Sequence, residues 1–276
     1  MKRLIQFPLL HIVDVAETCL TGDVLEPLAF DEWYCRRAGM GSPPLIHFWR
    51  HKKAMVLGLR DRRLPQAADA VEHLRKQGCA VAVRNSGGAA VPLDEGVLNV
   101  SVILPGSAAG RNFRADFSLL AEWIEQALRL LAGDVRIQVG EVQGAYCPGD
   151  FDLSVGGRKF CGIAQRRQID AFILQAFIVT DGQGAERAEQ VRQFYRIASG
   201  GLPPDERFPY PLIHPDRTAS LREALGECSV ESLVAALKKM LPERFLQLPP
   251  PYQDGPLSNE LRQMADTMRE RYDKDR

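Results

Sequence analysis

Cys147 is the residue of this sequence whose neighbours most favour chemistry. It is followed by Pro148 and Gly149, which suit the central positions of a type II turn because proline presets the first φ and glycine supplies the positive second one. Cys147 is therefore expected to open a turn, and loops carry a large share of catalytic groups. The histidines lie far from Cys147 in sequence, so a Cys-His pair is possible only if the fold brings a histidine close to Cys147.

Lys159 is the second candidate, and it follows Gly156-Gly157, a two-residue hairpin signal. Counting outward from this turn pairs Val155 with Arg158, Ser154 with Lys159 and Leu153 with Phe160. Lys159 is then expected to share a face with Ser154 and Cys161, while Leu153 and Phe160 face the core. A strand lysine is usually a solvated edge charge. If it meets Cys147, its ammonium favours the thiolate and can protonate a departing amine, so both interpretations stay open.

The segment Arg84-Asn85-Ser86-Gly87-Gly88 is a candidate for ligand contact. Adjacent glycines let the backbone approach a ligand and aim N–H groups at an acyl oxygen or a phosphate, although they also serve plain tight turns. The segment lacks the Gly-Lys-Ser/Thr ending of a phosphate-binding P-loop and is not a dinucleotide-binding G-x-G-x-x-G. Arg84 could hold a carboxylate or a phosphate, or pair on the surface.

The composition excludes several classes of protein. The 276 residues carry 35 basic and 35 acidic side chains, so no overall charge favours nucleic acid or an anionic membrane. No apolar run is long enough to span a bilayer, and the first residues are not expected to form a signal peptide, because polar residues and a proline interrupt the apolar stretch. The 6 cysteines lie far apart, which argues against disulfides and against a metal site, and favours the cytoplasm.

Alternating helical and strand patterns predict one α+β domain over residues 25–200. We expect strands 45–49 and 55–59 to form a hairpin, a strand at 135–139, and a helix that Asp116 caps and that ends at Ala132. A proline-rich connector then leads into a helical C-terminal extension within 201–276. Helices are expected there at 218–241 and 257–273, and the last is polar nearly all round, which is typical of a solvated tail. The extension is expected either to pack on the domain or to trail it.

Together these segments resemble the biotin/lipoate protein ligase and octanoyltransferase superfamily. The similarity extends from about Phe30 to Tyr195 and rests on three motifs. They are Arg84-Asn85-Ser86-Gly87-Gly88 followed by Gly96-Val97-Leu98-Asn99, the hairpin Gly157-Arg158-Lys159 continuing to Gly162-Ile163-Ala164-Gln165, and Ala145-Tyr146-Cys147-Pro148-Gly149. The resemblance implies a mixed central sheet flanked by helices. The cysteine loop looks most like that of octanoyl-[glycine cleavage system H protein]:protein N-octanoyltransferases.

The resemblance also implies roles for residues and partners. Cys147 and Lys159 fill the catalytic positions, and the implied substrate-binding residues are Arg84, Ser86, Gly87, Gly88, Asn99 and Gly162. Cys147 would take an octanoyl or lipoyl group from the H-protein lysine as a thioester. It would then pass the group to a lysine of lipoyl domains in 2-oxoacid dehydrogenase E2 subunits, without cofactor or metal.

Three other functions remain open at this point. The donor could instead be an acyl carrier protein, the chain could be an ATP-dependent lipoate ligase, or it could be a scaffold that binds lipoyl domains without chemistry. Cys161 departs from the family pattern, which has a small residue there, and it raises the question of which thiol reacts.

Overall fold

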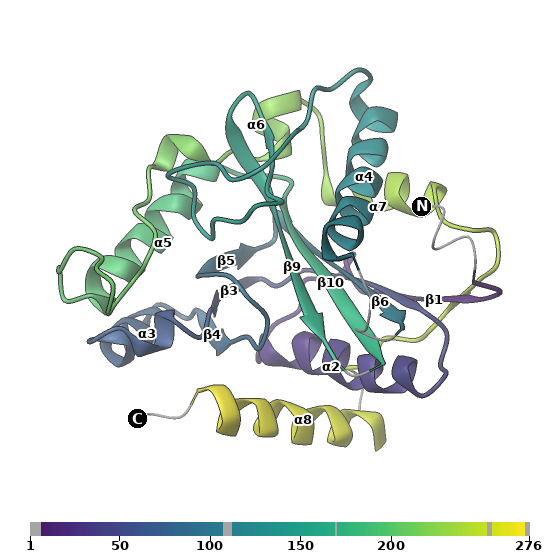
Figure 1. The fold of residues 1–276 in the computed structure, drawn as a ribbon, viewed down its shortest axis with the longest axis horizontal. Helices are drawn as coiled ribbons and strands as arrows, with labels where there is room; N and C mark the ends of the chain where they lie inside the picture. Colours follow the sequence, from purple (N-terminus) through teal and green to yellow (C-terminus); the bar gives the residue numbers. More distant parts are fainter. Residues whose placement is uncertain (1–6, 107–111, 169, 253–255, 274–276) are drawn as a thin grey trace.

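The computed structural model describes residues 7–106, 112–168, 170–252 and 256–273 (Figure 1). Its larger sheet is mixed and runs in the order β11-β1-β2-β6-β10-β9-β8-β7, and a smaller sheet runs β4-β3-β5. The strands of the larger sheet are β1 (Leu10–Asp14), β2 (Leu45–Trp49), β6 (Val97–Pro105), β7 (Gln138–Val139), β8 (Leu153–Val155), β9 (Arg158–Arg167), β10 (Ala171–Val179) and β11 (Phe245–Gln247). The smaller sheet consists of β3 (Lys53–Leu57), β4 (Ala80–Val83) and β5 (Val91–Asp94).

Both faces of the larger sheet are covered, as Figure 1 shows, which confirms the mixed sheet flanked by helices. The helices are α2 (Leu25–Gly39), α3 (Ala67–Lys76), α4 (Phe113–Ala132), α5 (Gly184–Ala198), α6 (Leu221–Leu225), α7 (Val230–Lys239) and α8 (Pro256–Tyr272). Successive strand residues join opposite cores: Ile12 and Ile46 pack with α4 and α7, whereas Val13 and Leu45 pack with α2. Burial on both faces explains why these strands are apolar almost throughout.

The expected hairpin of strands 45–49 and 55–59 is wrong. β2 pairs with β1 and β6, whereas β3 pairs with β4 and β5, so the two strands belong to different sheets. The backbone N–H of Lys52 donates to the carbonyl of Leu20. The polar segment between the two strands is therefore bonded to an earlier part of the chain and does not form a hairpin turn. The expected strand 135–139 is also shorter, because β7 covers only its last two residues.

Two helix ends differ from expectation for local reasons. α4 begins one turn earlier than expected, and Asn112 rather than Asp116 caps it, so Asp116 lies buried inside the first turns. The expected helix 218–241 is two helices. Gly226 ends α6 with a φ of 89°, and Ser229 starts α7 with a reciprocal capping box, which satisfies the N–H groups that a new helix start exposes.

Of the two arrangements expected for the C-terminal extension, the last helix adopts the packed one, because α8 packs along α2 and is not a solvated tail (Figure 1). Leu261, Ala265 and Met268 are buried in the same core as α2, and Trp33 donates its indole N–H to Glu260. The polar residues that dominate the helix cover its other faces. None of the described helices has the length and apolar character that a bilayer crossing requires.

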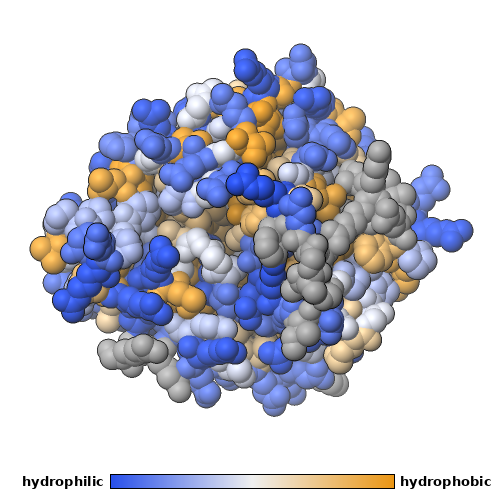
Figure 2. All heavy atoms as spheres, in the orientation of Figure 1, coloured by the Kyte–Doolittle hydropathy of each residue, from blue (hydrophilic) through white to orange (hydrophobic). Residues whose placement is uncertain are grey.

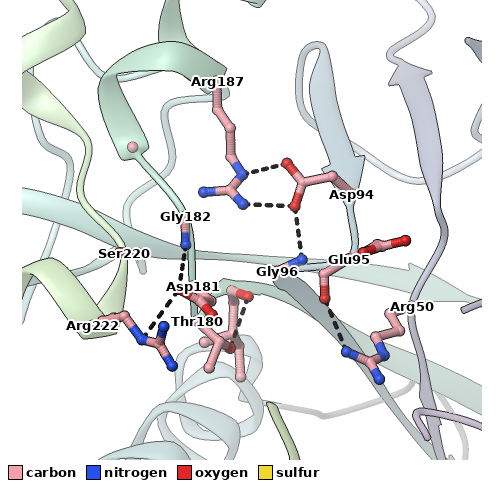
Figure 3. A network of polar contacts seen from close by, with 12 residues as sticks. Arg50, Asp94, Glu95, Gly96, Thr180, Asp181, Gly182, Arg187, Ser220 and Arg222 are labelled. Atoms are coloured by element: carbon pink, nitrogen blue, oxygen red, sulfur yellow. Dashed lines mark hydrogen bonds and ion pairs between the residues drawn. The ribbon is translucent and has the colours of Figure 1, made fainter. Parts of the chain in front are cut away.

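Arg187 of α5 locks the turn that carries the chain from the smaller sheet into the larger one. Figure 3 shows its guanidinium on the Asp94 carboxylate through two contacts of 2.6 and 2.7 Å, while Asp94 also accepts the N–H of Gly96. Arg187 is 4% exposed. This pair fixes β5 against β6, and both strands line the cavity described below.

Replacing Arg187 with alanine is expected to lower the free energy of unfolding by about 1–3 kcal/mol, because the charged bonds to Asp94 are lost. Arg192→Ala on the same helix is the control. Arg192 pairs with Glu189 at the surface, and loss of such a pair costs less than about 1 kcal/mol. Urea unfolding of both variants checks this, and equal losses would contradict the locking role.

Candidate active site

The loop that contains Cys147 has an unusual backbone. Cys147 has a φ of 48° and is the one non-glycine residue in the described part of the chain with positive φ. The type II turn expected at Pro148-Gly149 is wrong in this respect, because Gly149 does not have positive φ. A left-handed non-glycine residue costs on the order of 1–3 kcal/mol and persists only where its surroundings hold it.

Two groups contact the Cys147 sulfur. Arg84 donates from Nη2 to Sγ at 3.3 Å, and the backbone N–H of Ala89 donates to Sγ at 3.4 Å. Arg84 also donates to the carbonyl of Ala89 at 2.6 Å, which links the two donors. Gly88 makes this approach possible, because a Cβ there would lie 2.9 Å from Sγ and its φ is 104°.

Beneath the glycine-rich segment, Tyr195 of α5 fixes the chain that presents Ala89. Its hydroxyl donates to Asp61 at 2.7 Å and accepts the N–H of Ala90 at 3.1 Å. Burial raises the pKa of the Asp61 carboxyl, while the hydrogen bond from Tyr195 acts in the opposite direction. Tyr195 and Asp61 therefore hold the backbone at Ala90 in place, next to the glycine-rich segment.

Lys159 lies fully buried behind the cysteine loop. Its Nζ contacts Asp152 Oδ2 at 2.7 Å and donates to the carbonyls of Cys147 at 2.5 Å and Tyr146 at 3.0 Å. It also lies 5.4 Å from the centre of the Phe177 ring. The lysine is thus no solvated edge charge, and its ammonium meets the backbone of the candidate nucleophile.

Asp152 was not singled out in the sequence, yet it is the counter-charge of Lys159. The carboxylate is 1% exposed and also accepts the N–H of Gly149 at 3.1 Å. Burial raises the pKa of Asp152 to about 6, and the ammonium of Lys159 limits that rise. Asp152 therefore ties the strand lysine to the cysteine loop.

The hairpin that carries Lys159 contains a bulge that the sequence count did not include. Ser154 pairs with Lys159 and Val155 with Arg158 as expected, but Leu153 pairs with Cys161 instead of Phe160. The extra residue turns Cys161 into the core formed with Phe160 and Leu153, so the expected shared face with Lys159 is wrong. Burial raises the pKa of the Cys161 thiol far above its usual value.

A cavity of about 560 Å³ opens beside Cys147 between the larger sheet, the smaller sheet and α2. Figure 2 shows mostly hydrophilic side chains on this face of the molecule, with paler and orange residues in a central hollow. Apolar side chains from α2, β3, β5 and β10 line the cavity, among them Leu28, Val56, Val91, Leu93 and Phe177. Its size and character suit a fatty acyl chain.

The structure gathers the expected site residues around this cavity. Those that line it are Arg84, Ser86, Gly87, Gly88, Asn99, Cys147 and Gly162. Lys159 does not line it, but a Cβ on Gly162 would lie 3.3 Å from its Nζ. The Ser86 hydroxyl and the Asn99 amide nitrogen are buried without partners, and so is the indole N–H of Trp49, a lining residue that the sequence did not indicate.

No group of three or more His, Cys, Asp or Glu side chains within the described ranges is placed to hold a metal ion. The chemistry that the arrangement itself offers is that of a sulfur nucleophile. The guanidinium of Arg84 and the backbone N–H of Ala89 donate to the sulfur. An apolar cavity adjoins the sulfur, and the buried ion pair of Lys159 and Asp152 lies behind it.

Residues 23–242 match the family described as the lipoyl protein ligase A/B catalytic domain. The chain is 40% identical to an octanoyl-[GcvH]:protein N-octanoyltransferase of Anoxybacillus flavithermus, over 87% of this chain and 86% of that protein. It is 35% identical to a lipoyl-[GcvH]:protein N-lipoyltransferase of Listeria monocytogenes, over 74% and 72%. Among solved structures, a putative lipoate protein ligase from T. acidophilum with bound lipoic acid covers 96% of both chains, with a TM-score of 0.65 and 19% identity.

Proposed function

The chain belongs to the lipoyl protein ligase A/B catalytic family, and on this premise we propose that Cys147 is the nucleophile of its acyl transfer reaction. The enzyme is an octanoyl-[GcvH]:protein N-octanoyltransferase, which moves an octanoyl or lipoyl group from GcvH to other lipoyl domains. The observation that carries the role of Cys147 is its strained backbone, which presents the sulfur to Arg84 and Ala89 at the edge of the acyl-sized cavity.

The acceptors that we propose are the lysine-bearing lipoyl domains of 2-oxoacid dehydrogenase E2 subunits. We assign the transfer chemistry to residues 25–200 and a bracing role to 201–276, where α8 packs on α2. The cytoplasm is the compartment we propose, because a reducing environment keeps Cys147 available as a thiol.

In the proposed reaction, Cys147 Sγ bonds to the acyl carbon of the octanoyl-lysine amide. The carbon–nitrogen bond to the donor lysine then breaks, and the amine leaves with a proton delivered through Lys159. Attack by the acceptor lysine reverses these steps and returns the thiol. Arg84 donates to the sulfur, and N–H groups of the Ser86-Gly87-Gly88 segment are our candidates for binding the oxyanion.

The cavity supplies the binding energy for the acyl chain. Each buried methylene contributes about 0.8 kcal/mol, so a butanoyl donor, which lacks four of them, is expected to lose about 3 kcal/mol relative to octanoyl. This corresponds to a drop in kcat/KM of about 100-fold. Competition between octanoyl-GcvH and butanoyl-GcvH for one acceptor measures the ratio, and equal rates would contradict an acyl chain in this cavity.

Donor choice tests the proposal as a whole. The enzyme is incubated with an E2 lipoyl domain and, in separate reactions, octanoyl-GcvH, octanoyl-acyl carrier protein, or octanoate with ATP. Transfer is expected from octanoyl-GcvH alone, the donor that the octanoyltransferase relatives of this chain are named for. ATP should not be needed, because this donor already carries the acyl group. Transfer only from the carrier protein, or only with ATP, would replace the proposed reaction by one of those activities. Binding of the lipoyl domain without transfer from any donor would indicate a scaffold.

A further inference from the structure

The Lys159 ammonium is fully engaged in the resting site. An ammonium has three N–H donors, and Lys159 directs them to Asp152 Oδ2 and to the carbonyls of Cys147 and Tyr146. Its hydrogen bonds therefore act on the peptide groups before and after Cys147. A lysine that served only to exchange protons would not need these two carbonyl contacts.

The two carbonyl contacts explain how a strained backbone is maintained at Cys147. The residue keeps its left-handed conformation only if its surroundings offset the cost. A buried cation that binds two consecutive carbonyls provides a strong interaction of this kind. That conformation points the sulfur at Arg84 and at the Ala89 N–H.

Asp152 is the group that keeps this cation in place. Lys159 is 0% exposed, and a buried ammonium without a counter-charge tends to lose its proton. Asp152 supplies the counter-charge and bonds the Gly149 N–H on the far side of Cys147. The same carboxylate thus holds both the lysine and the end of the cysteine loop.

We propose that Asp152 is a positioning residue of the transfer reaction, because it fixes the Lys159 ammonium on the carbonyls that hold Cys147 in place. This inference rests on the proposed role of Cys147 and goes beyond it by assigning a further residue. Asp152 borders the acyl cavity, but its carboxylate is directed to Lys159 and the Gly149 N–H, so it acts through Lys159. The Asp152→Asn change keeps the size of the side chain and therefore the lining of the cavity.

The groups around Asp152 define the expected pH dependence. Asp152 interacts electrostatically with other titratable groups. They are Lys159 and Cys161 on β9, Tyr146 in the cysteine loop, and Glu141 before that loop. Burial raises the pKa of Asp152 to about 6, whereas it raises the pKa values of Tyr146 and Cys161 far above that range. As the pH falls through about 6, Asp152 is therefore the member of this cluster that takes up a proton and releases Lys159.

The test is the rate of Cys147 alkylation by iodoacetamide, mapped by peptide mass spectrometry between about pH 5 and pH 9, together with steady-state transfer. If the thiol alone took up a proton, the alkylation rate would fall with a one-proton slope. In the wild type, the rate below about pH 6 is expected to fall more steeply, because Asp152 takes up a second proton. Asp152→Asn is expected to lack this extra steepness and to be alkylated at least tenfold more slowly at pH 8. Its kcat for transfer should fall by a similar factor, with the KM for octanoyl-GcvH unchanged.

Asp150→Asn is the matched control, since it removes one negative charge from the same loop at an exposed position, and it should behave as the wild type. A folded Asp152→Asn protein with the wild-type rate and pH curve would overturn the inference. If that variant does not fold, the wild-type curve decides, and a one-proton slope through pH 6 overturns it. Alkylation uses no acyl donor, so failure of octanoyl transfer in the wild type would count against the proposed function alone.

Discussion

Replacing Cys147 with alanine is expected to lower kcat/KM for octanoyl transfer by about 10³-fold or more, the size of effect typical when a covalent nucleophile is removed. The other candidate groups cannot substitute for the sulfur, because Arg84 is a permanent cation and Lys159 is committed to Asp152 and two carbonyls. The variant should unfold at nearly the wild-type temperature, since the side chain lost is small and lies at the edge of a cavity.

Cys161→Ala provides the matched control for this prediction. Cys161 is also a buried cysteine, but it packs with Phe160 and Leu153 in the opposite core. Its replacement should cost about 1–3 kcal/mol of stability through a small cavity, with transfer retained. The assignment of the nucleophile would be wrong if Cys161→Ala abolished transfer while Cys147→Ala preserved it.

Replacing Lys159 with methionine is expected to lower kcat by about 10²- to 10⁴-fold, since a proton donor to the departing amine is lost. Methionine keeps much of the side-chain volume, so the packing against Phe177 is largely maintained. The variant should also lose about 3–5 kcal/mol of stability near pH 8, because the Asp152 carboxylate is left buried without its partner.

The stability loss of Lys159→Met has a defined pH dependence. Without the ammonium, the pKa of Asp152 lies even further above its value in the unfolded chain, so stability is lost as the pH rises and recovered as Asp152 takes up a proton. Urea unfolding near pH 5 and pH 8 measures the difference. Lys238→Met is the control, as Lys238 forms a partly exposed pair with Asp14 and should change stability by less than about 1 kcal/mol. A pH-independent loss in Lys159→Met would contradict the buried pair.

The sequence predicted the components of the candidate site better than their contacts. Glycine pairs, a cysteine-proline-glycine turn and a hairpin lysine are local patterns, and their residues gather around one cavity. Asp152 gave no signal because a loop aspartate is ordinarily solvated, and only the fold places it against the buried ammonium of Lys159. Trp49 likewise has the sequence pattern of an ordinary strand residue, and only the pairing of β2 with β6 places it opposite Asn99.

The errors in the fold share a physical cause. Strand patterns identify β2 and β3, but their pairing depends on contacts that are distant in sequence, so a short polar link was taken for a hairpin turn. The register shift opposite Leu153 and Ser154 leaves one extra residue in β9, and this reverses the face expected for Cys161. The apolar stripe of α8 is narrow, and its partner α2 lies more than two hundred residues earlier, as the contact between Trp33 and Glu260 shows.

Intact-mass spectrometry after brief mixing with octanoyl-GcvH, in the absence of acceptor, tests the covalent role of Cys147 most directly. We predict that the wild-type enzyme gains the mass of one octanoyl group, that peptide mapping places it on Cys147, and that an E2 lipoyl domain then removes it. Cys161→Ala should gain the same mass and Cys147→Ala none. Rapid transfer by the wild type with no adduct at any time, or an adduct on another cysteine, would contradict the account.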